Sequence, residues 1–83
     1  MPGCPIQTFD KIDTLVWMCL VARAREYGVA IEGNSGEVAS HGGRARWNYD
    51  PQREWLEIEV LKLPFPVSCA QAAKALREAV ASC

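Results

Sequence analysis

The sequence lacks most of the signatures that would assign this chain to a reaction or to a membrane. It has a single histidine, and none of its four cysteines stands in a Cys-x-x-Cys pair, so zinc-site spacing is absent. The N-terminus has no basic segment leading into an apolar core, which argues against a signal peptide. The apolar run at residues 15–22 is far shorter than the roughly 20 residues that span a bilayer. We therefore expect a cytoplasmic protein, outside the membrane, with no metal or cofactor.

An excess of charge of one sign is also missing, although 23% of the residues are charged. The 83 residues carry a net charge of −1, and 49% of them are hydrophobic. A chain of this length forms one small domain, and its charge gives no general attraction to nucleic acid or to an anionic membrane. A net charge so close to zero weakly favours self-association.

The four cysteines are far apart in sequence. Cys19 and Cys69 fall at core-type positions of expected helices, where a free cysteine behaves as a small hydrophobic residue. We expect both to be reduced and buried, with Cys4 and Cys83 more accessible. A disulfide involving Cys4 or Cys83 and a metal site are the alternatives.

The first helix is expected over residues 10–27, after an N-terminal tail at residues 1–8. Thr8 or Asp10 can cap it, Asp13 adds negative charge to its first turn, and Gly28 can end it. Residues 15–22 are all apolar, so this helix is apolar on every side over two turns. One side can face a sheet, and the other needs a second helix or another chain.

An antiparallel sheet is expected over residues 29–63. Residues 29–32 and 37–40 have strand composition and flank a turn-like segment, so they form either a hairpin or one bulged strand. Gly42 and Gly43 permit a tight reversal. Strands at residues 44–49 and 56–60 follow, with alternating apolar and polar residues.

The second hairpin has a definite expected register. Asp50 and Pro51 suit the start of a type I turn, and a loop at residues 50–53 places Trp47 opposite Leu56. The same register pairs the arginines of one strand with the glutamates of the other, as Arg46–Glu57 and Arg44–Glu59. One face is then apolar, and the other carries opposite charges.

A final helix is expected over residues 68–82, because two prolines end the strand and Ser68 with Gln71 forms a capping box. The predicted fold is α+β, in the order α-β-β-β(-β)-α, with an antiparallel meander of three or four strands and both helices on one face. The predicted core comprises Leu15, Val16, Leu20, Ile31, Trp47, Leu56, Ile58, Val60, Leu76 and Val80.

No residue constellation predicts catalysis. His41 lies among glycines in a loop, and Glu57 and Glu59 have expected arginine partners. A stacking platform for single-stranded nucleic acid is also disfavoured, because alternation separates Trp47 and Tyr49 from the arginines. We expect a protein without enzymatic activity.

A set of apolar residues lacks an expected cover: Trp55, Leu61, Leu63 and Phe65 near the outer sheet face, and Met18 on the first helix. These form a candidate interaction surface, unless the tail at residues 5–7 covers the sheet part. The leading hypothesis is a protein-interaction or self-associating module, as a homodimer or with another protein. The alternative is a binder of a small apolar ligand, which requires a cavity between helices and sheet, and single-stranded nucleic-acid binding ranks lower.

Overall fold

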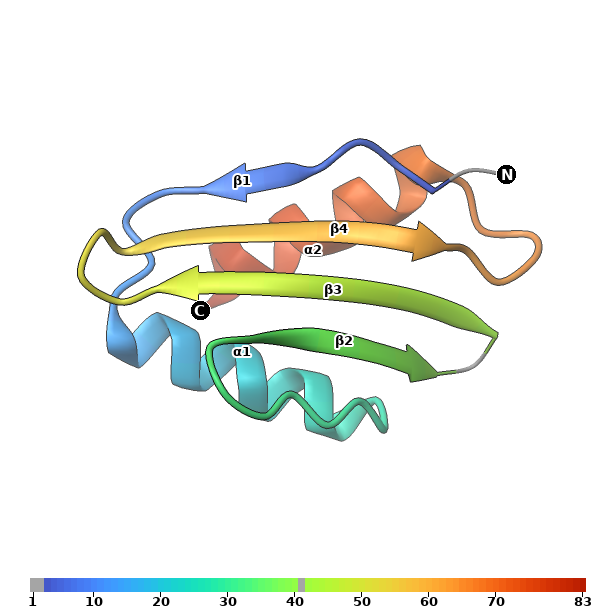
Figure 1. Ribbon diagram of the computed structural model, residues 1–83. Helices are drawn as coiled ribbons and strands as arrows, with labels where there is room; N and C mark the ends of the chain where they lie inside the picture. The colour runs from blue at the N-terminus through green and yellow to red at the C-terminus, as the bar shows by residue number, and fades with distance from the viewer. Residues whose placement is uncertain (1–2, 41) are drawn as a thin grey trace.

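In the computed structural model, the described residues 3–40 and 42–83 form an antiparallel sheet with two helices behind it (Figure 1). The elements are β1 (Gln7–Phe9), α1 (Thr14–Glu26), β2 (Ser35–Ser40), β3 (Gly43–Asp50), β4 (Trp55–Lys62) and α2 (Cys69–Ser82). The strand order across the sheet is β1-β4-β3-β2, so β2, β3 and β4 form a meander. The predicted α+β class, the meander and the helices on one face are confirmed.

The fourth strand comes from the N-terminal tail. In β1, Gln7 lies opposite Ile58 of β4, and the backbone N–H of Cys4 donates a hydrogen bond to the carbonyl of Val60. The tail passes so close to β4 that a Cβ on Gly3 would lie 2.1 Å from the Val60 carbonyl oxygen. The tail therefore extends the edge of the sheet.

In the glycine-rich stretch before β2, residues 29–34 form no strand. The strand of this region is β2, which covers Ser35–Ser40. Both expectations, a hairpin of residues 29–32 with 37–40 and one bulged strand over them, are therefore wrong. β2 then reverses into β3, with Ser40 opposite Gly43 and Gly42 at a φ of +84°. His41, the loop histidine considered above, lies outside the described residues.

The faces of the β3–β4 hairpin agree with the alternation, but the predicted register is wrong by two residues. Arg46 lies opposite Glu59 instead of Glu57, and Arg44 lies opposite Lys62. The cause is Glu54, whose φ of +52° places it in the loop and not in the strand. The loop therefore covers residues 51–54, and the whole pairing moves by two positions without changing faces.

Both helices begin at capped residues. Asp13 caps α1 by accepting a hydrogen bond from the Val16 N–H at 2.9 Å, so the helix begins several residues later than the sequence suggested. Ser68 and Gln71 form the predicted capping box of α2.

The prediction of free thiols at Cys19 and Cys69 is wrong, because both cysteines form disulfides. Cys69 bonds to Cys4 and Cys19 bonds to Cys83, with partners 65 and 64 residues apart in sequence. The tail brings Cys4 along β4 to the start of α2, and the end of α2 meets the middle of α1. Each end of α2 is therefore tied covalently to another part of the fold.

The closed part of the core lies under the β3–β4 loop. Ile12, Tyr49 and Leu56 are at most 3% exposed, and the Trp17 ring stacks on Tyr49 with centroids 4.6 Å apart. The Tyr49 hydroxyl donates a hydrogen bond of 2.8 Å to the Ile12 carbonyl. Leu15, predicted as core, is 76% exposed, because it lies on the side of α1 turned away from the sheet.

Candidate functional site: a groove between the helices

An open apolar groove separates the two helices over the inner face of the sheet. The helices meet at the Cys19–Cys83 disulfide and diverge from there (Figure 1), which leaves a cavity of about 610 Å³. Its apolar walls come from α1, the loop before β2, the sheet and α2: Trp17, Leu20, Val29, Ile31, Val38, Ala45, Trp47, Leu56, Ile58, Leu76 and Val80. This volume lies within the range of about 300–1,000 Å³ that is typical of small-molecule sites.

Local packing fixes the sheet wall of the groove. The Trp47 ring lies against Gly36 of β2, where a Cβ would come within 3.0 Å of the ring. The Trp47 indole N–H also points to the carbonyl of Gly33, at 3.3 Å. Glycine at position 36 therefore lets a large aromatic side chain lie flat beneath the groove.

A second hollow of about 370 Å³ continues the groove toward the start of α2. The two cavities share Val29, Val38, Ala45, Ile58, Ala75 and Leu76. The second one then extends to Leu63, Pro64 and Val67 beyond the end of β4. Together they form one elongated apolar trough along the sheet.

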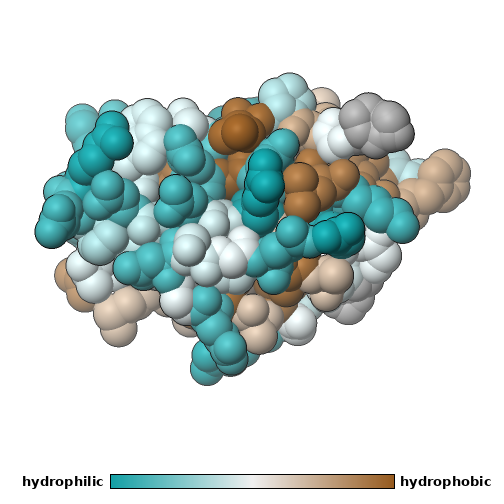
Figure 2. Space-filling model, in the orientation of Figure 1, coloured by the Kyte–Doolittle hydropathy of each residue, from teal (hydrophilic) through white to brown (hydrophobic). Residues whose placement is uncertain are grey.

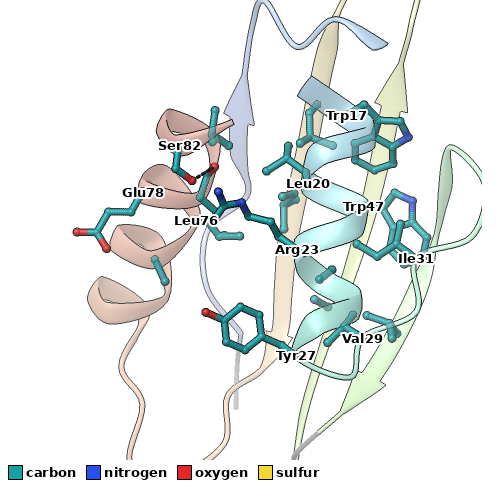
Figure 3. A pocket seen from close by; sticks show the side chains of 18 of the residues that line it. Trp17, Leu20, Arg23, Tyr27, Val29, Ile31, Trp47, Leu76, Glu78 and Ser82 are labelled. Carbon is teal, nitrogen blue, oxygen red and sulfur yellow. Dashed lines mark hydrogen bonds between the residues drawn. The ribbon is translucent and has the colours of Figure 1, made fainter. Parts of the chain in front are cut away.

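The polar side chains at the groove are few. Figure 3 shows the Arg23 side chain reaching from α1 toward α2, whose Leu76 and Ser82 line the same cavity, while the Glu78 carboxylate points away from the groove. The Ser82 hydroxyl donates to the Ala79 carbonyl within α2. Within the described residues, Arg23 has neither an ion pair nor a hydrogen-bond partner.

The titratable group with a shifted pKa is Tyr49, which lies beside the groove in the closed core. Burial raises the pKa of the Tyr49 phenol, and the hydrogen bond with Thr14 acts in the opposite direction. No group of His, Cys, Asp or Glu side chains in residues 3–40 and 42–83 could hold a metal ion. The groove therefore offers shape, apolar surface and a cation.

The residues of the candidate interaction surface do not lie together. Trp55 and Leu61 are half-buried on β4, with the Trp55 indole N–H donating to the Glu57 carboxylate. Phe65 is 97% exposed in the loop after β4, and Met18 is 60% exposed on α1. The set is spread over the sheet, a loop and a helix.

Leu63 was placed on the outer face by alternation, and that placement is wrong. Val60 lies opposite Ala45 while Lys62 lies opposite Arg44, so Leu61 has no opposite residue on β3. Such a bulge reverses the alternation beyond it. Leu63 consequently lines the inner trough.

The outer face of the sheet carries many hydrophilic side chains, with hydrophobic patches among them near the middle and the upper edge of the view (Figure 2). Arg44 pairs with Glu37 of β2, and the Arg46 Nε donates to the Glu59 carboxylate at 2.8 Å. Trp47 and Tyr49, the aromatic residues of β3, lie on the inner face and are buried. The structure thus separates these arginines from these aromatic rings.

Comparisons with protein-family models, with curated proteins and with solved structures find no match for this chain. Within the described residues, no helix is long and apolar enough to cross a membrane. The sequence predicted a first helix with two apolar sides and a thin, alanine-rich second helix, but it did not predict where a groove between them would lie.

Proposed function

We propose that this protein binds an apolar small molecule in the groove between α1 and α2. The observation that carries the proposal is the 610 Å³ cavity, whose walls are apolar side chains of both helices and the sheet. An apolar pocket with a few polar groups at its edge is the usual form of a ligand site. Burial of the wall on ligand binding would contribute about 25 cal/mol for each Å² of apolar surface removed from water.

Binding of the neutral dye Nile red tests this proposal. We expect saturable binding at one site, with a change in tryptophan fluorescence because Trp17 and Trp47 line the cavity. Ala75 lines both parts of the trough, so Ala75→Trp should fill it and weaken binding at least tenfold. Ala70→Trp is the matched control, since Ala70 is exposed on α2 and lines neither cavity. Equal binding by both variants would contradict the proposal.

The disulfides bear on the compartment in which the protein works. The sequence favoured the cytoplasm, but disulfides form and persist in oxidising compartments and are rare in the cytosol. With Cys4–Cys69 and Cys19–Cys83 both formed, we propose that the protein works in an oxidising compartment.

Self-association is a second candidate function. Leu15 and Met18 are 76% and 60% exposed and lie on the side of α1 opposite the groove, so a second copy could bind there without filling the groove. The net charge of −1 gives little repulsion between two copies. We expect sedimentation to show a concentration-dependent dimer that Met18→Glu abolishes and Trp55→Glu does not. A monomer at high concentration would contradict this candidate.

A further inference from the structure

We propose that the ligand of the groove is an anionic amphiphile, an aliphatic chain with a carboxylate head, and that Arg23 binds the head. The inference rests on the proposed function and specifies its ligand class. It combines two observations: Arg23 has no charged partner among the described residues, and an apolar trough leads away from it.

Arg23 lies where a head group would enter. It lines the larger cavity but not the smaller one, and its side chain extends from α1 across the opening toward α2 (Figure 3). The nearby end of α2 presents the negative end of a helix dipole, yet no α2 carbonyl accepts a hydrogen bond from Arg23 in the described part of the chain. The five N–H donors of its guanidinium therefore remain available to a ligand.

The charged neighbours leave this cation uncompensated. Glu78 of α2 turns its carboxylate away from the groove. Arg44 and Arg46 also belong to the lining of the trough, but they are outer-face residues of β3, and their charges pair with Glu37 and Glu59. An anion at the opening would thus meet Arg23 without an opposing carboxylate, and a guanidinium matches a carboxylate in a bidentate geometry.

The trough suits a chain more than a compact molecule. From Arg23 it continues past Ile58 and Leu76 into the second hollow, which ends near Leu63 and Val67. Its walls along this path are mostly aliphatic. A ligand anchored at Arg23 would therefore lay an aliphatic tail along the inner face of the sheet.

Calorimetric titration with dodecanoate and with the neutral dodecanol tests the proposal, below the concentrations at which either aggregates. We expect wild-type protein to prefer dodecanoate by about tenfold, the lower end of what a charge-assisted hydrogen bond supplies, because Arg23 is exposed. Arg23→Gln should lose this preference and still bind dodecanol, which shows that the variant folds and keeps its groove.

Two matched variants remove other cations. Arg25→Gln removes a charge from α1 outside the groove, and Lys62→Gln removes one beside the second hollow. Both should keep the preference for dodecanoate. Loss of the preference in Lys62→Gln but not in Arg23→Gln would overturn the assignment to Arg23, and equal affinity of wild type for both ligands would overturn the anionic head. If neither compound binds, the proposed function itself fails.

Discussion

The two ends of the inner sheet face carry similar apolar residues but are covered very differently. Under the β3–β4 loop, Ile12 and Leu56 are at most 1% exposed and pack with Tyr49. Toward the other end, Ile58 and Leu76 are half-buried and line a trough. Both ends are hydrophobic, so composition does not explain the difference. What differs is how close α2 comes to α1, and the disulfides fix both ends of α2.

The largest expected effect comes from removing these covalent ties. Each disulfide joins residues 64 or 65 positions apart, and loops of that length correspond to about 4 kcal/mol of denatured-state entropy. We expect Cys19→Ala/Cys83→Ala and Cys4→Ala/Cys69→Ala to lower the free energy of unfolding in urea by similar amounts.

Only the first pair joins the two helices, so only its removal should also change Nile red binding in the groove. Native wild-type protein should show no thiol that reacts with a labelling reagent, since all four cysteines are bonded. Rapid labelling of Cys19 would contradict the account of the helices.

Truncating one aliphatic side chain at each end compares the two regions directly. Ile12 is 1% exposed and lines neither cavity, so Ile12→Ala should cost about 3 kcal/mol because it leaves a void in the closed core. Leu76 lines the open groove, so Leu76→Ala should cost about 1 kcal/mol. Chemical denaturation of both variants measures the difference, and equal costs would mean that the groove is closed in solution.

The pH dependence of stability reports on the closed end. The folded-state pKa of Tyr49 is raised by burial, so the unfolded chain loses its phenol proton first as the pH rises. The stability that Tyr49 supplies is therefore complete below pH of about 10, the ordinary tyrosine pKa, and is lost as the pH rises from there through the folded pKa. Tyr49→Phe should flatten this alkaline loss.

Denaturation of wild type and of Tyr49→Phe between neutral pH and a pH of about 11 measures this loss. The same loss in Tyr49→Phe as in wild type would show that Tyr49 is not buried as described.

The smallest effect is expected on the outer face. Arg46 and Glu59 form an exposed ion pair, worth less than about 1 kcal/mol. A double-mutant cycle between these two residues should give a measurable coupling, while a cycle between Arg46 and Glu57 should give none. Coupling to Glu57 instead would restore the register that the sequence suggested.

The sequence predicted the faces of the elements better than their relative positions. The two-residue period of β3 correctly buried Trp47 and Tyr49, and the Ser68 capping box correctly began α2. The register failed because the alternation is unchanged by a shift of two residues, so nothing in the pattern places Glu54 in the loop. Leu63 was misplaced because a bulge depends on the pairing of two strands.

The candidate site was largely beyond the sequence for a similar reason. Helical periodicity shows that α1 has two apolar sides, but it does not give the distance between α1 and α2. That distance depends on contacts such as Cys19–Cys83, whose partners are 64 residues apart and carry no spacing motif. Arg23 likewise acquires a role only when the fold brings it to the opening of the groove.

Methyl NMR during a titration with dodecanol tests the central claim, that the inner face is open at one end and closed at the other, most directly. The account predicts progressive shifts for Val38, Ile58 and Leu76, which line the trough. It also predicts no shift for the methyl signals of Ile12 in the closed core and of the exposed Leu15 on the far side of α1. Unchanged signals at the trough residues, or shifts confined to Leu15, would contradict it.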